Sequence, residues 1–536
     1  MTALDSQQGL HKSSETHSLH QHSESNTHVT PREHISQPQT PTCEQAPTST
    51  QSTPTRAQSA TATQPNQHIP RQCSVEYADT NDHWGYDSGK SFTLAQAQSP
   101  QDWLNVALRA ERYVAQFQHD DADGIYWEGA DSPTPNPGYA DGSAGIMYFY
   151  LELFRATGDE QYRHIAYRAA HWLLAHWHDQ HEQSGTALEG FDSCLGNILL
   201  EAYKAFGDET FATAAREFAQ GYIDSAVLGS VGPRWSGNTA WAKDGAIILF
   251  LLNLGRTLND SDVLDFVKQA GEQYLSQGVI NTDGRLVFDG KLGGTAVWEG
   301  IVFRQDYNMP NWEFGAAGSG FIVLKLYELT GDERYLNAAR DQLHYLRSVA
   351  VPQTKGVLIP RSLDPDPQES DVFYIGHCHG IAGTGKFLYE LLRITGDDNA
   401  QALINDLADG AESLGAPEHQ SKGLWNIVTL CCGHAGLVHY FIGLYLATGN
   451  NRWRDLAVRA GNVILGMRED LSDGSTNWPI AFWRVKPTEI TRPHTLFRGA
   501  AGVGLALIEL YMASSGRFTL DRLIDDPFPA DWQGNF

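Results

Sequence analysis

The chain has 536 residues, of which 41% are hydrophobic, and this is enough to bury a large core. Its 38 basic and 64 acidic side chains leave a formal net charge of −26. Such a charge repels nucleic acids and anionic lipid surfaces, so we expect neither as a partner, and small molecules or peptides fit better.

The N-terminal segment differs in composition from the rest of the chain. Between Met1 and Gln72 there is no Phe, Trp or Tyr, while Ser, Thr, Gln, Pro and His dominate. Because such a segment cannot offset its ordering entropy by burying apolar surface, we expect a disordered tail over residues 1–75 and a linker over 76–100. The segment lacks the apolar stretch of a secretory signal, and its acidic residues argue against a transit peptide. We therefore expect a cytoplasmic protein without membrane contact.

A cluster of small residues recurs along residues 101–525, and each copy leads into an apolar run that stops at Gly-Asp or a near equivalent. The clearest copies read GSAGIMYFYLELFRATGD, GAAGSGFIVLKLYELTGD, GIAGTGKFLYELLRITGD and GHAGLVHYFIGLYLATGN. Three weaker copies lie near Cys194, Gly245 and Gly499. Seven copies predict seven structural units.

Each stop predicts the end of one helix and the start of another, because Gly supplies a left-handed cap and the following Asp or Asn caps the next helix. The first helix of each pair is apolar nearly all round, whereas the second is amphipathic, as in Leu336, Ala339 and Leu343. First helices are therefore expected inside a ring and second helices outside it, with 101–117 closing the circle. The expected fold is all-α, a seven-hairpin α/α toroid with short β-containing loops at one mouth and a C-terminal tail at 526–536.

Two neighbouring repeats carry cysteine at the same position. Cys378 lies five residues before Gly383, Cys431 lies five residues before Gly436, and Cys432 follows directly. Zinc takes thiolate and imidazole ligands, and a helix N-terminus favours thiolates. Three thiols at matched positions favour a zinc site over ordinary buried cysteines.

Histidines and carboxylates flank these cysteines. His377, His379 or His434 is an alternative ligand in place of one cysteine, and the sequence does not choose between them. His379 and His434 are also candidates for the catalytic acid and base, although a hydrogen bond that orients a metal ligand is an equally good interpretation of each. Carboxylates near repeat starts, which could face the centre or cap helices, are Asp141, Glu189, Asp192 and Glu313.

With these motifs, the chain from about residue 101 onward resembles the lanthionine synthetase C-like family. HCHGIAG supplies Cys378, and LCCGHAG supplies Cys431 and Cys432, which is the all-cysteine variant of the family's zinc ligands. The resemblance implies a zinc-dependent enzyme that adds a peptide cysteine thiol to dehydroalanine or dehydrobutyrine, giving a thioether ring. Family cyclases have a His and an Arg where this chain has Phe314 and Tyr374.

The resemblance also implies a dehydrated precursor peptide as substrate and a separate dehydratase that prepares it. An alternative function is zinc-dependent binding or transfer of a small, glutathione-like thiol without ring formation, and the change of the His and Arg positions motivates it. A carbohydrate-active toroid is a third hypothesis, but it needs two carboxylates facing each other across the cavity, and the sequence indicates no such pair.

Overall fold

The computed structural model describes residues 91–130, 132–177, 190–290, 295–298, 301–304, 307–365, 372–420, 423–483 and 488–536. The expected tail at 1–75 and the expected linker up to residue 90 lie outside the described residues. Within the described ranges, no helix is both long and apolar enough to cross a bilayer.

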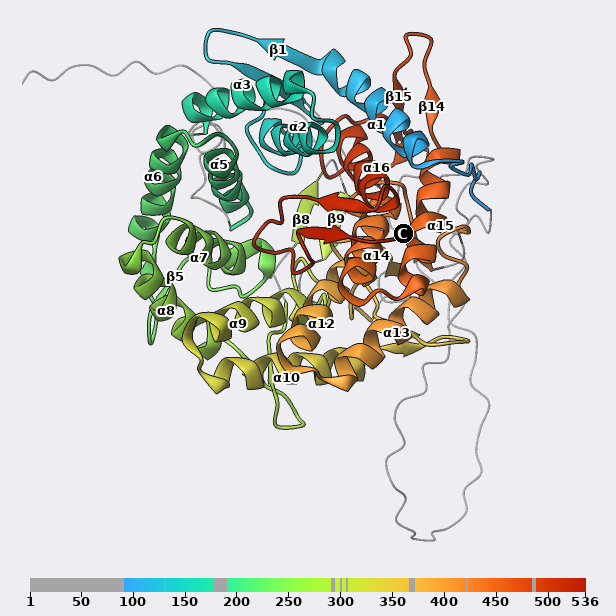
Figure 1. Cartoon of the computed structure of the whole chain (residues 1–536). Coiled ribbons are helices and arrows are strands. Elements are labelled where there is room, and N and C mark those ends of the chain that lie inside the picture. The colour runs from blue at the N-terminus through green and yellow to red at the C-terminus, as the bar shows by residue number, and fades with distance from the viewer. Residues whose placement is uncertain are drawn as a thin grey trace, which may run out of the picture. The chain divides into compact units, whose positions relative to one another are not determined.

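Fourteen α-helices in the described residues pair into seven hairpins, which confirms the predicted α/α toroid (Figure 1). The inner helices are α2 Ser143–Thr157, α5 Ser193–Phe206, α7 Ala246–Thr257, α9 Ala316–Thr330, α12 Ile381–Thr395, α14 His434–Thr448 and α16 Ala500–Ser514. The outer helices are α1 Pro100–Val114, α3 Glu160–His176, α6 Glu209–Ser225, α8 Ser261–Ser276, α10 Glu333–Val349, α13 Asp398–Ser413 and α15 Asn451–Gly466. Each inner helix contacts the next, α16 contacts α2, and α1 packs on α16, so the ring closes as expected.

The helix ends follow from the local sequence. Gly331 has a φ of 69° and its N–H donates to the carbonyl of Tyr327, which ends α9. The Asp332 side chain then accepts a hydrogen bond from the N–H of Arg334 at 2.9 Å and starts α10. Four other inner helices also end at a glycine with left-handed backbone conformation, and these are Gly158, Gly207, Gly396 and Gly449. Left-handed backbone is accessible to glycine without the steric cost of a Cβ, so the repeated Gly-Asp stop is a structural requirement of the hairpin.

The glycines at the helix starts have a different role, which is close approach. A Cβ on Gly383 would lie 1.9 Å from the carbonyl oxygen of His377 and 2.6 Å from the Cβ of Trp312. The loop before α12 can therefore fold back onto the first turn of the helix only because this position lacks a side chain. This packing holds the loop that carries Cys378.

Short strands lie in most of the connections that lead from an outer helix to the next inner helix, and two more follow α16. They are β1 Gln118–Asp120, β2 Ile125–Gly129, β3 Ser132–Pro135, β4 Val227–Leu228, β5 Pro233–Arg234, β6 Val279–Ile280, β7 Leu286–Val287, β8 Thr295–Trp298, β9 Ile301–Arg304, β10 Val351–Pro352, β11 Val357–Leu358, β12 Phe373–Tyr374, β13 Leu424–Trp425, β14 Glu469–Asp470, β15 Thr476–Asn477, β16 Ile480–Ala481, β17 Ile490–Thr491, β18 Arg517–Thr519 and β19 Asp531–Gln533. Strands β1 to β17 lie between the end of an outer helix and the start of the next inner helix, which is the mouth where the inner helices begin. Among these described strands β12 and β13 pair in parallel and the other pairs are antiparallel.

Residues 526–536, expected as a C-terminal tail, pack against the ring. Strand β19 pairs with β18, the Phe528 side chain is buried and stacks on Tyr389 with ring centroids 5.0 Å apart, and the Tyr445 hydroxyl donates to the carbonyl of Asn535. These contacts place the segment at the mouth where the inner helices end, opposite the β-containing loops.

Candidate metal centre

The two loops that carry cysteine lie side by side ahead of α12 and α14. Parallel pairing of β12 with β13 sets the loops in the same register. The N–H groups of His377 and Cys378 both donate to the carbonyl of Cys431, at 2.6 and 3.2 Å. Because the repeats are equivalent and directly bonded, Cys378 from one hairpin meets Cys431 and Cys432 from the next.

The three sulfur atoms form one compact group. The Sγ of Cys432 lies 3.5 Å from the Sγ of Cys378 and 3.4 Å from the Sγ of Cys431, and all three cysteines are free thiols. Three thiolates around one zinc at about 2.3 Å in tetrahedral geometry are about 3.8 Å apart, so the observed spacing suits a shared cation. Cys378 and Cys432 are buried and Cys431 is half-buried. The structure thus brings together the three cysteines predicted from the repeat.

Electrostatics couple the three thiols. Hydrogen bonding to the Cys378 sulfur, together with burial, raises the pKa of Cys431 and of Cys432 well above the usual value. Burial by itself would raise the pKa of Cys378. The hydrogen bonds from Cys431 and Cys432 have the larger combined effect, so the pKa of Cys378 is held well below the usual value. The cluster therefore stabilises one thiolate by itself, and a bound cation would be needed to stabilise three.

Glu313 and His379 form a polar pair beside Cys378. The Oε2 of Glu313 lies 3.6 Å from the Nε2 of His379, and the ligand atoms of Glu313, Cys378 and His379 lie within 4.8 Å of one another. Burial raises the pKa of Glu313 to about 8, helped by the negative charge of Cys378, and burial lowers the pKa of His379 to about 4. At neutral pH this gives a protonated carboxyl next to a neutral imidazole. Within the described residues, the buried Nδ1 of His379 has no hydrogen-bond partner.

His434 does not join this group. Its Nδ1 lies 2.9 Å from the carbonyl oxygen of Ile427 and its Nε2 lies 2.7 Å from the carbonyl oxygen of Pro417, while the Phe92 ring packs edge-on against it. The side chain is fully buried, and burial lowers its pKa against the opposing effect of the two carbonyls. Since both ring nitrogens face backbone oxygens, we assign His434 to holding the loop before α14 in place of the expected catalytic role.

An arginine lies near the positions where the family has its His and Arg. The rings of Phe314 and Tyr374 pack on His379, with centroid distances of 5.5 and 5.7 Å. The guanidinium of Arg361 lies 5.9 Å from the centroid of the Tyr374 ring, and its positive charge opposes the rise in the pKa of Glu313. Arg361 comes from the long connection between α10 and α12, where no sequence motif marks it.

Of the other carboxylates predicted near repeat starts, the two described ones, Asp141 and Asp192, do not reach the sulfurs. Asp141 accepts hydrogen bonds from Thr495 and from the Nε of Arg498, both at 2.9 Å. Asp192 is the residue that precedes α5, and Glu189 lies outside the described residues. Of the described members of that set, Glu313 is the one that the structure places beside the cysteines.

Comparison with known families agrees with this geometry. The model of the lanthionine synthetase C-like proteins matches residues 307–519, a segment that contains the three cysteines, Glu313 and His379. Residues 307–519 belong to the lanthionine synthetase C-like family. Within this segment, the observed fold and the cluster of three cysteines agree with the prediction from the sequence. No curated protein matches the chain.

Several solved structures resemble the chain. Nisin cyclase is 14% identical, the alignment covers 76% of this chain and 98% of that protein, and the TM-score is 0.51. The Lin0763 protein from Listeria innocua is 14% identical over 77% of this chain and 97% of its own, with a TM-score of 0.39. An unsaturated glucuronyl hydrolase specific for heparin is 12% identical over 77% of this chain and 98% of its own, with a TM-score of 0.41. At such identities, the similarity to nisin cyclase shows a shared fold.

Proposed function

We propose that the chain is a zinc-dependent cyclase, which adds a cysteine thiol of a dehydrated peptide to dehydroalanine or dehydrobutyrine and so forms a thioether ring. The observation that carries the proposal is the meeting of Cys378, Cys431 and Cys432 within coordinating distance of one point. Membership of residues 307–519 in the lanthionine synthetase C-like family supports it.

The donor set suits thiol chemistry better than hydrolysis. Zinc held by three thiolates would leave a site with one negative charge, and such a site keeps a bound substrate sulfur electron-rich while making bound water less acidic. In the addition, the substrate sulfur forms a bond to the β-carbon of the dehydro residue. The electron pair of the double bond moves to the α-carbon, which then takes a proton, so the ring has the same mass as the linear peptide.

This chain offers its own groups for binding and proton transfer. His379 and Glu313 lie next to Cys378, at the mouth where the inner helices begin. We propose that the neutral imidazole of His379 accepts the proton that leaves the thiol, and that the protonated carboxyl of Glu313 supplies the proton that the α-carbon takes. Arg361 is the cation beside them, placed to stabilise the negative charge that develops on the carbonyl oxygen of the dehydro residue. We propose His379 as the catalytic histidine of this chain, with Glu313 as its partner.

The cyclase proposal is tested with a synthetic peptide that contains one dehydroalanine and one cysteine. We expect zinc-loaded protein to consume the peptide thiol, measured by maleimide trapping, with no change in peptide mass other than the missing maleimide adduct. Cys378→Ala is expected to abolish the reaction. Cys194→Ala is the matched control, because Cys194 is a buried free cysteine in another repeat. Equal thiol loss with wild-type protein and with Cys378→Ala would refute the proposal.

A second candidate function is zinc-dependent binding or transfer of a glutathione-like thiol without ring formation. Phe314 and Tyr374 favour it, because they stand where family cyclases have His and Arg. Titration of zinc-loaded protein with glutathione by calorimetry distinguishes the two. Saturable binding of glutathione combined with no thiol loss from any dehydrated peptide would favour this candidate over the cyclase.

The partners follow from the leading proposal. A dehydrated precursor peptide is the substrate, and the dehydro residues come from a separate dehydratase reaction. Copurification of the tagged protein with a dehydratase from the same cells, followed by mass spectrometry of the bound peptides, is the measurement that checks both.

A further inference from the structure

The repeat that brings the three cysteines together also places a second set of metal donors one hairpin earlier. The loops before α9, α12 and α14 each end at the glycine that precedes the helix. Three residues lie two positions before these glycines and are therefore equivalent in the repeat, namely Glu313, Cys378 and Cys431. The N–H of Glu313 donates to the carbonyl of Cys378 at 2.9 Å, just as the N–H of Cys378 donates to the carbonyl of Cys431 at 3.2 Å. Neighbouring loops are thus joined in the same way.

The cysteine cluster takes one residue from one repeat and two successive residues from the next. Cys378 comes from the loop before α12, and Cys431 and Cys432 come from the loop before α14. One repeat earlier, the same three positions hold Glu313 before α9, and Cys378 and His379 before α12. A carboxylate, a thiolate and an imidazole are all zinc ligands. The pattern of the cysteine cluster therefore occurs twice, with Cys378 common to both copies.

The next pairs of repeats on either side lack this donor set. In the loop before α16, Phe497 and Arg498 hold the two successive positions, and neither is a metal ligand. On the other side, Ala242 holds the first position, and its N–H donates to the carbonyl of Glu313 at 3.0 Å. Phe314 follows Glu313, so that pair of repeats offers one donor. Three donors meet in this pattern at two neighbouring places in the described ring.

The side chains of the second set converge on one point. The ligand atoms of Glu313, Cys378 and His379 lie within 4.8 Å of one another, and the Oε2 of Glu313 lies 3.6 Å from the Nε2 of His379. Two ligands at about 2.0–2.1 Å from one zinc ion in tetrahedral geometry are about 3.3–3.4 Å apart, so the observed spacing suits a shared cation. Cys378 and His379 are buried and Glu313 is half-buried.

His379 has metal-binding capacity that the described part of the chain does not use. The residue is 7% exposed, and its enclosed Nδ1 has no hydrogen-bond partner among the described residues. Its Nε2 lies beyond hydrogen-bonding distance of Glu313. Among the same residues, the carboxyl of Glu313 makes no ion pair with Lys or Arg. A buried imidazole without a partner calls for a ligand, and a cation next to Glu313 and Cys378 is one that all three groups can bind.

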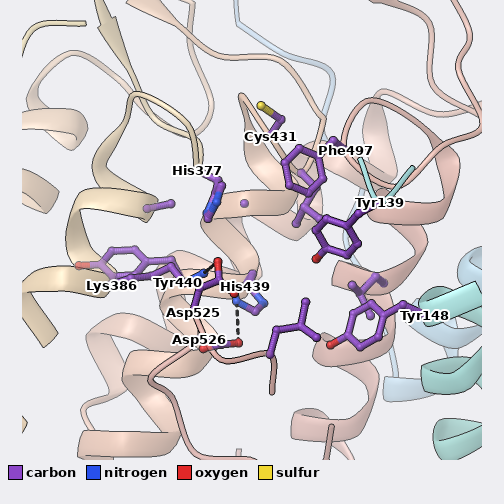
Figure 2. Close-up of a pocket in the computed structure, with 15 residues that line it drawn as sticks. Tyr139, Tyr148, His377, Lys386, Cys431, His439, Tyr440, Phe497, Asp525 and Asp526 are labelled. Atoms are coloured by element: carbon purple, nitrogen blue, oxygen red, sulfur yellow. Dashed lines mark hydrogen bonds and ion pairs between the residues drawn. The ribbon is translucent and has the colours of Figure 1, made fainter. Parts of the chain in front are cut away.

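The carboxylates inside the ring offer no comparable site. Figure 2 shows Asp525 and Asp526 in a cavity that they share with Lys386 and His439. The Nζ of Lys386 lies 3.3 Å from the Oδ2 of Asp525, and the Nε2 of His439 lies 3.1 Å from the Oδ2 of Asp526. Cys431 borders the same cavity, but its sulfur points away from these groups (Figure 2). Since both carboxylates are already paired with basic side chains, an added cation would be repelled there.

We propose that Glu313, Cys378 and His379 form a second, weaker zinc site, which shares the sulfur of Cys378 with the site of three cysteines. Charge favours this arrangement. One zinc ion with three thiolates carries one negative charge, and a second zinc ion together with the Glu313 carboxylate brings the pair to neutrality. The second site is the weaker one, because an oxygen and a nitrogen replace two thiolates and because the positive charge of Arg361 acts on Glu313.

The second site also predicts a form of regulation. A second zinc ion would occupy the imidazole of His379 and the carboxyl of Glu313, which are the groups that the proposed cyclisation uses for proton transfer. We therefore expect excess zinc to inhibit ring formation. This consequence rests on the proposed function, whereas the second zinc site rests on the geometry of the donors alone.

The test measures zinc bound by the full chain after equilibrium dialysis at increasing free zinc, using elemental analysis. At high free zinc, we expect wild type to hold about one zinc ion more than Glu313→Gln, and at low free zinc the two should hold the same amount. Zinc bound by other histidines of the chain is common to both proteins and cancels in the difference. Asp123→Asn is the matched control, because Asp121, Asp123 and His176 form an exposed group with metal-ligand spacing. It should bind as much zinc as wild type.

Two further variants test the shared sulfur. His379→Gln should lose the same zinc ion as Glu313→Gln, and Cys378→Ala should lose both. Equal zinc content in wild type and Glu313→Gln at every concentration, or a loss in Asp123→Asn instead, would overturn the second site. Retention of either zinc ion by Cys378→Ala would show that its sulfur is not shared.

Inhibition is measured separately with the peptide that contains dehydroalanine and cysteine. The rate of thiol loss should fall over the range of free zinc in which wild type takes up its second ion. A rate that stays constant over that range would refute the inhibitory role. If the protein does not cyclise the peptide at all, the cyclase proposal fails, and the zinc contents of the variants still decide whether the second site exists.

Discussion

His439 ties the C-terminal segment to the inside of the ring, and its replacement should remove a specific pH dependence of stability. Its Nδ1 donates to Glu509 on α16 and its Nε2 donates to Asp526, while Lys386 and Arg522 also act on Asp526. Burial alone lowers the pKa of His439, but the two carboxylates raise it to about 9. The imidazole is therefore a cation at neutral pH.

The magnitude follows from the difference between the folded and unfolded pKa values. An unfolded histidine titrates near pH 6.5, so a folded pKa of about 9 corresponds to at most about 3 kcal/mol of stability. Because the folded pKa is the higher one, this stability is fully present below about pH 6.5 and is lost as the pH rises through about 9. The pKa of Asp526 is held well below its usual value, so its charge does not change over this range.

Urea unfolding of wild type and of His439→Gln, measured between about pH 6 and pH 9.5, checks this. Glu313, whose pKa is raised to about 8 by burial, titrates in the same range, but it does so in both proteins, so the difference between the two curves isolates His439. We expect the wild-type advantage to shrink with rising pH by about 2–3 kcal/mol. Two curves that stay parallel over the whole range would show that His439 is not held as a cation.

Three further variants test the fold and the site. His434→Ala should lower the free energy of unfolding by about 1–3 kcal/mol yet keep the metal, because the ring bonds only to backbone; metal loss at unchanged stability would contradict its structural role. Gly443→Ala should destabilise by about 1–3 kcal/mol, since its Cβ would lie 2.3 Å from the ring of Phe528; an unchanged urea midpoint would contradict that packing. Cys432→Ala should release the metal, as measured by elemental analysis, and retention of the full metal content would contradict its place as a ligand.

Much of the fold could be predicted because the repeat encodes it locally. The Gly-Asp stop specifies a left-handed cap and a new helix start within two residues, and the contrast between apolar and amphipathic helices specifies which lies inside. The equivalence of Cys378 and Cys431 in neighbouring repeats then places both at one edge of the ring. The C-terminal segment escaped prediction, since Phe528 and Asp526 bind through contacts with distant helices that no local pattern reveals.

The surroundings of the sulfurs were less accessible from the sequence. His379 and His434 both sit beside cysteines in the chain, yet His379 faces Glu313 whereas His434 faces backbone carbonyls, because a helix start turns successive side chains in different directions. Arg361 lies in a long irregular connection, so its approach to Tyr374 depends on loop packing alone.

The central claim is that three sulfur atoms of this chain hold one zinc ion. X-ray absorption at the zinc edge of purified, zinc-loaded protein tests it most directly. The account predicts a first shell dominated by about three sulfur atoms at about 2.3 Å, which loses sulfur in Cys378→Ala and keeps it in Cys194→Ala. A shell made only of nitrogen and oxygen atoms, or a sulfur shell unchanged in Cys378→Ala, would contradict it.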